Sequence, residues 1–144
     1  MNERTHRRLD LAIEQLDDAI TLFLDRRRFA SAITLAGAAE EIFGKELSRR
    51  GQEHVLDWKF SQLSICHRLL HGKELLKKSF FDEENRVRNC LKHFGETDPI
   101  FTADLETPAV WMIVRSMENA RRLEFEIERF VDFDNWFYEH VVGI

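Results

Sequence analysis

Apolar residues recur at intervals of three or four along most of this chain, which is the spacing of one face of an amphipathic helix. The first such stripe contains Leu9, Ile13, Leu16 and Ile20. Similar stripes predict helices over about residues 3–25, 29–50, 57–76, 81–94 and 108–132. The sequence holds neither a β-hairpin signal nor an internal repeat. We therefore predict an all-α fold, an antiparallel bundle of four to five helices that forms one domain over residues 1–144.

Glycine and proline indicate where these helices end and begin. Gly51 is expected to stop the second helix, Gly72 to break the third and Gly95 to end the fourth. Residues 95–107 form the one long predicted loop. Thr107 is expected to cap the last helix, with Pro108 at its first position, because proline's fixed φ suits that position.

The composition is typical of a globular protein. The chain has 44% hydrophobic and 33% charged residues, and its formal net charge is −5. The first twenty residues are charged and amphipathic, so we expect neither a signal peptide nor membrane contact. Cys66 and Cys90 are expected to be reduced thiols of a cytoplasmic protein. Because the net charge is negative, the protein does not have a surface that is basic overall. Any contact with nucleic acid must therefore be local.

One segment, residues 85–94, differs from the rest because it carries three basic residues, two asparagines and a histidine but no acid. On a helix that turns about 100° per residue, its apolar residues share one arc. Those residues are Val87, Cys90, Leu91 and Phe94. The opposite arc holds Asn85, Arg86, Arg88, Asn89, Lys92 and His93. One face is therefore expected to pack, and the other to present polar groups.

That polar arc suits a phosphodiester. Guanidinium, ammonium and amide groups bind phosphate oxygens, and an imidazole can move a proton near neutral pH. We assign RNA or phosphate binding to Asn85, Arg86 and Lys92. The alternative is a solvated helix face without a ligand, because Arg88 and His93 lie about 140° apart around such a helix.

The stretch Arg88-Asn89-x-x-x-His93 resembles the signature of the HEPN superfamily, in which an arginine precedes a histidine by four to six residues. Arg86 and His93 fit the longer spacing. The Ala-rich stretch from Ala36 to Phe43 looks like the second helix of these domains. As architecture the resemblance covers most of the chain, and as chemistry it covers only the helix around Arg88.

The resemblance implies a metal-independent endoribonuclease that acts on RNA as a homodimer, in toxin–antitoxin or defence systems, without a cofactor. It implies that His93 transfers protons, that Arg88 stabilises developing charge and that Asn89 orients His93 or the phosphate. A large toxin subgroup has tyrosine two residues after the histidine. Here Phe94 and Gly95 follow, so regulation through that tyrosine is not expected.

Two acids of the second predicted helix complete the candidate site. Glu40 falls within the apolar stripe of that helix, so a carboxylate there should be buried and paired. We expect Glu40, with Glu41 beside it, to pair with Arg88 or Arg86 and hold that arginine in position. The alternative is that both are surface acids without a role in the site.

Other readings stay open. His67 and His71 lie four residues apart and would allow a metal site, although solvated histidines are the commoner case. The aromatic residues 130–138 form either a partner surface or, as we expect, a segment docked on the bundle. The main alternative function is a non-catalytic adaptor that binds RNA, a nucleotide or a protein. A cognate antitoxin or another acidic protein could also be the partner of the basic arc.

Overall fold

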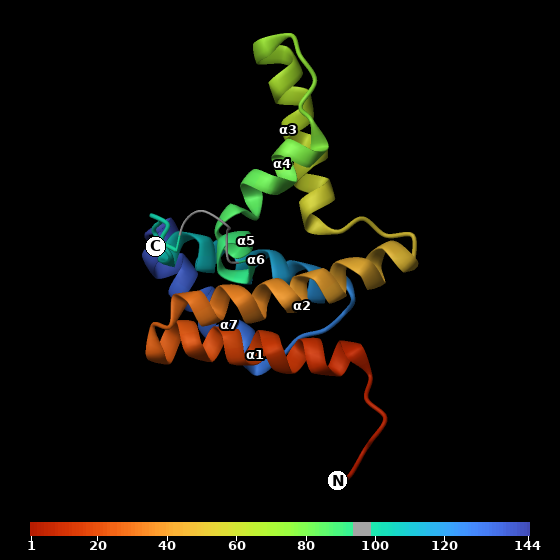
Figure 1. Cartoon of the computed structure of the whole chain (residues 1–144), viewed down its shortest axis with the longest axis vertical. Coiled ribbons are helices and arrows are strands. Elements are labelled where there is room, and N and C mark those ends of the chain that lie inside the picture. The colour runs from red at the N-terminus through yellow and green to blue at the C-terminus, as the bar shows by residue number, and fades with distance from the viewer. Residues whose placement is uncertain (94–98) are drawn as a thin grey trace.

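The computed structural model describes residues 1–93 and 99–144, and helices make up its regular secondary structure (Figure 1). Its elements are α1 (Arg8–Arg26), α2 (Phe29–Arg49), α3 (Val55–His71), α4 (Lys77–Glu84), α5 (Arg86–Lys92), α6 (Glu106–Arg122), α7 (Glu128–Phe137) and a π-helical turn, η1 (Tyr138–Val142). The two described ranges contain no β-strand, so the all-α prediction is confirmed. They contain seven α-helices rather than four or five.

The larger number arises because two predicted helices are each divided. The helix expected over 81–94 is α4 and α5, separated at Asn85. The helix expected over 108–132 ends at Arg122, and the backbone then turns through Glu124, whose φ of 67° is left-handed. Leu123 beside that turn is buried, so the apolar spacing continues through the break and conceals it.

Helix ends were predicted with mixed success. Gly72 adopts a left-handed conformation and ends α3, as expected. The last residue of α3 is His71, so the helix does not continue to residue 76, where the predicted helix ended. The expectation that Thr107 caps α6 is wrong, because the helix begins at Glu106, two residues before Pro108, and its N-cap position is Leu105. The Asp104 carboxylate accepts hydrogen bonds from the backbone N–H groups of Glu106 and Thr107, at 3.0 and 3.3 Å. The predictions that fall on Phe94 and Gly95 lie outside the described residues.

The core lies between α1, α2, α6 and α7. Helix α2 packs against both α1 and α6 along its length. The largest wholly buried apolar side chains come from these four helices, namely Phe23, Phe43, Phe130, Phe133, Leu16, Ile20, Ile33, Leu47 and Ile113. The C-terminal aromatic segment docks on this core, as expected, since Trp136 and Phe133 lie 4.7 and 5.7 Å from Phe23 between ring centroids.

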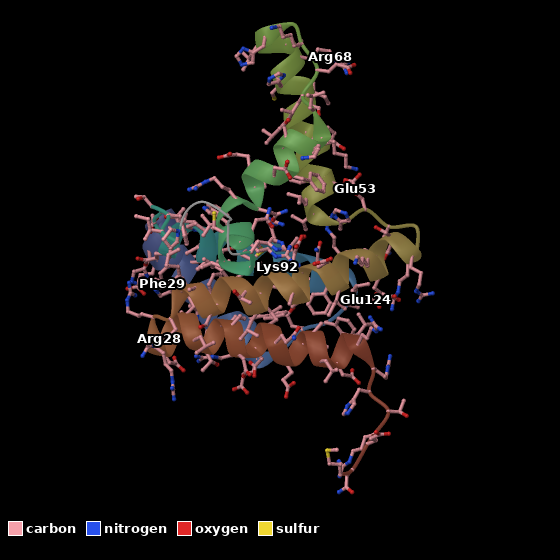
Figure 2. All side chains as sticks on the ribbon, viewed as in Figure 1. Arg28, Phe29, Glu53, Arg68, Lys92 and Glu124 are labelled. Carbon is pink, nitrogen blue, oxygen red and sulfur yellow. The ribbon has the colours of Figure 1, made fainter. Side chains whose placement is uncertain are left out.

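Helices α3 and α4 form an arm that projects from the bundle, with Arg68 near its far end (Figures 1 and 2). Leu56 and Phe80 are the buried residues of these two helices. The exposed fractions of Leu69, Leu70 and Leu76 are 80%, 78% and 68%. The arm is therefore attached to the body at its base and largely surrounded by solvent elsewhere.

The arm also carries the two histidines that could have formed a metal site. The rings of His67 and His71 lie 4.8 Å apart, and Nδ1 of His67 is 2.9 Å from the carbonyl oxygen of Lys73. In the part of the chain that the structure describes, no three His, Cys, Asp or Glu side chains gather as metal ligands would. Within the same residues, every helix is too short or too polar to cross a bilayer.

Candidate functional site

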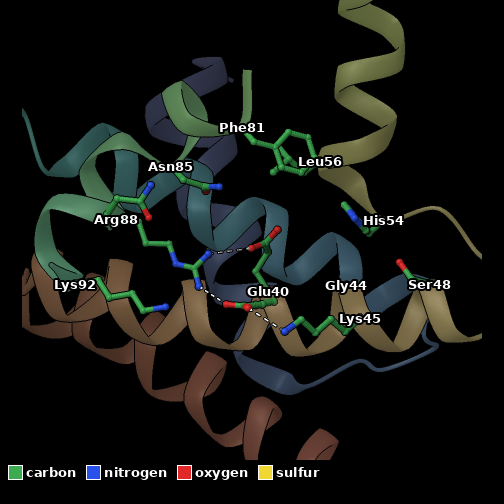
Figure 3. Close-up of a pocket in the computed structure, with 12 residues that line it drawn as sticks. Glu40, Gly44, Lys45, Ser48, His54, Leu56, Phe81, Asn85, Arg88 and Lys92 are labelled. Carbon is green, nitrogen blue, oxygen red and sulfur yellow. Dashed lines mark hydrogen bonds and ion pairs between the residues drawn. The ribbon is translucent and has the colours of Figure 1, made fainter. Parts of the chain in front are cut away.

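A hollow of about 380 Å³ lies where α5 meets α2 beside the base of the arm (Figure 3). Its floor is α2, which contributes both acids of the predicted site. His54 and Leu56 stand opposite Lys92, and Phe81 closes the upper side (Figure 3). The lining residues are Glu40, Glu41, Gly44, Lys45, Ser48, His54, Leu56, Phe81, Asn85, Arg88, Asn89 and Lys92.

Arg88 is the centre of this arrangement. Its Nη2 donates to Oε2 of Glu41 at 2.8 Å, and its Nη1 lies 3.8 Å from Oε2 of Glu40. Only 14% of the Arg88 side chain is exposed. Arg88, on the arc opposite the packing face, is therefore in contact with α2, while Val87 of the same helix packs in the core. The carboxylates of Glu41 and Glu40 hold the Arg88 guanidinium in position and balance much of its positive charge.

Gly37 creates the space that Arg88 occupies. A Cβ at this position would lie 2.7 Å from Nε and 2.9 Å from Cδ of Arg88, which is closer than real side chains allow. Gly44 lies two turns further along α2, and a Cβ there would be 3.6 Å from the His54 ring. Gly37 thus leaves room on α2 for one side chain of α5.

Glu40 is held from the opposite side by Arg115, a residue that the sequence analysis missed. Nη2 of Arg115 lies 3.0 Å from Oε1 of Glu40 and donates to Oδ1 of Asn85 at 3.0 Å. The side chains of Arg115 and Glu40 are 7% and 8% exposed, so this is a buried pair. The expectation that Glu40 is buried, paired and next to Arg88 agrees with this geometry. Arg115 lies about 180° around α6 from the apolar stripe that contains Val110, Ile113 and Met117, so the apolar spacing offered no signal for this partner.

Asn119 connects the site to the arm. Its Nδ2 donates to the carbonyl oxygen of Glu40 at 3.3 Å, and its Oδ1 accepts from the backbone N–H of Val55 at 2.9 Å. His54 caps α3, with Nδ1 accepting from the N–H of Asp57 and Nε2 lying 2.9 Å from the Asp57 carboxylate. Both ring nitrogens of His54 are therefore engaged in structure, although the ring lines the hollow.

The charges on the floor are closely balanced. Hydrogen bonds from Arg88 first, and from Lys45 second, hold the pKa of the Glu41 carboxyl below its ordinary value. Lys45 lies 3.1 Å from Glu41 on the side away from Arg88. Lys92 and Asn89 are exposed above this network. The hollow thus offers one ammonium and one amide beside an ion-paired floor, which suits an anion held at the rim.

The structure divides the predicted site residues into two groups. Those that line the hollow together are Asn85, Arg88, Asn89, Lys92, Glu40 and Glu41. His93 is not among the lining residues. It is exposed directly after the last residue of α5, where the backbone has become extended. Arg86 lies on the far side of Arg88 and lines a second hollow. Of the residues predicted to bind phosphate or to act in catalysis, the hollow between α2 and α5 therefore contains Asn85, Arg88, Asn89 and Lys92 but neither Arg86 nor His93.

Comparison with known proteins gives no relative of this chain. No family model matches it, and no curated protein or solved structure does either. The assignment to the HEPN superfamily accordingly stays a prediction that rests on the residues from Arg88 to His93 and on the Ala-rich stretch from Ala36 to Phe43.

Proposed function

We propose that this chain is a HEPN-like, metal-independent endoribonuclease that holds a phosphodiester of RNA at the rim of the hollow between α2 and α5. The observation that carries the proposal is Arg88, fixed by Glu41 and Glu40 directly beneath the exposed Asn89 and Lys92. A guanidinium whose position is fixed in advance stabilises charge that develops on a phosphate without further reorganisation.

In the proposed reaction, Lys92 and Asn89 bind the non-bridging phosphate oxygens. His93 takes the proton of the ribose 2′-hydroxyl as that oxygen attacks phosphorus. The bond from phosphorus to the 5′-oxygen breaks, and the leaving oxygen receives a proton. The products are a 2′,3′-cyclic phosphate and a 5′-hydroxyl. Each atom and proton is supplied by the RNA, the protein side chains and water, so the scheme requires no cofactor.

One histidine cannot be the base and the acid in the same step. His54 does not supply the second group, because both its ring nitrogens are engaged by Asp57. We therefore propose a homodimer in which two α5 helices approach each other, so that the exposed His93 of each copy serves one shared site. Such an enzyme would suit a cytoplasmic toxin–antitoxin or defence system, with a protein antitoxin as its regulator.

The test is cleavage of end-labelled single-stranded RNA in EDTA. The wild-type protein should produce fragments that end in 2′,3′-cyclic phosphate, and His93→Ala should lose this activity while keeping its helical circular dichroism. His71→Ala is the matched control, because His71 is exposed on the arm, and it should cleave normally. Equal activity in the wild type and His93→Ala would remove His93 from the mechanism.

A second candidate function has an observation of its own. Arg88 already contacts two carboxylates, and His93 is not among the residues of the hollow. Both facts favour an adaptor of the same fold that binds RNA or a nucleotide and leaves it intact. Binding of RNA without any cleavage by the purified wild type would establish this alternative and exclude the nuclease.

A further inference from the structure

A second hollow of about 550 Å³ lies on the other side of Arg88, between α5, α6 and the base of the arm. This volume is in the range of sites that bind small ligands. Arg88 lines both hollows, so they are adjacent across α5. The lining residues are Ile33, Lys59, Glu83, Glu84, Arg86, Val87, Arg88, Thr107, Pro108, Trp111, Met112 and Arg115.

Trp111 is the aromatic residue of this second hollow. It is 48% exposed, whereas the neighbouring Met112 and Val87 are buried. Phe137 contacts it edge to face, with centroids 5.7 Å apart and planes at 81°. Phe137 holds the indole in place and leaves about half of it open. An exposed, fixed indole is a platform on which any nucleobase can stack.

Four cations line this hollow together with Trp111. Arg86 is exposed and is the first residue of α5. Nζ of Lys59 lies 2.8 Å from both carboxylate oxygens of Glu84. Arg88 and Arg115 are balanced by Glu40 and Glu41. Glu83 is the acid that opposes an anion here, so a phosphate should lie on the Arg86 side.

We infer that this second hollow receives one unpaired nucleobase, stacked on Trp111, of a strand whose next phosphate lies beside Arg86 and whose scissile phosphate lies over α5. The ligand class is therefore single-stranded RNA with a base turned out of any helix. This inference rests on the proposed function, since it names the substrate of the same site. An aromatic platform beside a guanidinium fits a nucleotide better than a purely apolar peptide.

The test measures affinity for a fully 2′-O-methylated single strand, which lacks the 2′-hydroxyl and cannot be cleaved by the proposed reaction. Trp111→Ala should weaken binding by about 5- to 150-fold, the usual loss when one stacking residue is removed. Trp58→Ala is the matched control, because Trp58 is also 48% exposed but lies on the arm. It should change the affinity less than twofold. Trp111→Phe should retain most of the binding and Trp111→Leu should not.

The remaining outcomes separate this inference from the proposed function. Equal losses in Trp111→Ala and Trp58→Ala, unchanged binding in Trp111→Ala, or retention in Trp111→Leu would overturn the nucleobase site, even if RNA is cleaved. Failure of the wild type to bind any single strand would overturn it as well. Absence of cleavage together with a Trp111-specific loss of binding would refute the nuclease alone. A strand of abasic nucleotides should bind wild type and Trp111→Ala equally.

Discussion

At the scale of single residues, replacing Gly37 or Gly44 of α2 by alanine should affect stability differently. Gly44→Ala places a methyl group at ordinary contact distance, 3.6 Å from its nearest neighbours. Because alanine favours helices, this change should raise the free energy of unfolding by up to about 1 kcal/mol. Gly37→Ala gains the same propensity but must displace Arg88, whose Nε would lie 2.7 Å away. Urea denaturation should therefore find Gly37→Ala less stable than Gly44→Ala. Equal stabilisation by both would mean that Arg88 does not occupy this space.

Glu41 should make stability depend on pH. Its pKa is lowered in the folded protein, mainly by the hydrogen bond from Arg88, relative to its ordinary value of 4.5. A carboxyl whose pKa is lower in the folded protein contributes stability that is complete at pH values above the unfolded-state pKa. That stability is lost as the pH falls through the folded-state pKa. Urea midpoints of wild type and Glu41→Gln should therefore differ at pH 7 and converge below about pH 4.5. Because Glu41 is 44% exposed, high salt should shrink the difference. A constant difference from pH 7 to pH 3 would contradict this.

At the scale of elements, the sequence predicts most where apolar stripes are complete. Residues 29–50 were expected to be helical, and α2 spans Phe29–Arg49. The breaks at Asn85 and Glu124 could not be seen, since no glycine or proline marks them and the helical spacing continues across both. The polar arc of α5 was recognised from its residues. Its contact with α2, and the role of Arg115, depend on how three helices cross, which a linear pattern does not contain.

The arm should be the least stable of the described helical elements. Buried apolar residues are few in α3 and α4, whereas α1, α2 and α6 bury their stripes against one another. Local opening therefore costs less free energy in the arm. Hydrogen exchange should label α3 amides beyond Phe60 faster than those of α2 between Ala32 and Leu47. Equal protection of both segments would indicate that another surface covers the arm in solution.

At the scale of the whole molecule, the proposed binding of RNA depends on how charge is distributed over the surface. The net charge of −5 repels a polyanion in general, so binding depends on a local excess of cations. Lys92 is exposed at the hollow, while Arg88, Arg115 and Lys45 each contact a carboxylate. Few counterions should therefore be released on binding, and the dependence of affinity on salt should be shallow.

The most direct test of the central claim, that the hollow between α2 and α5 holds the phosphodiester, is the salt dependence of binding to a non-cleavable single strand. The slope of log affinity against log salt should become shallower by about 0.7 in Lys92→Gln, the effect of one lost phosphate contact on a single strand. Lys73→Gln, a change at an exposed lysine on the arm, should leave the slope unchanged. An unchanged slope in Lys92→Gln, or an equal change in Lys73→Gln, would contradict the account.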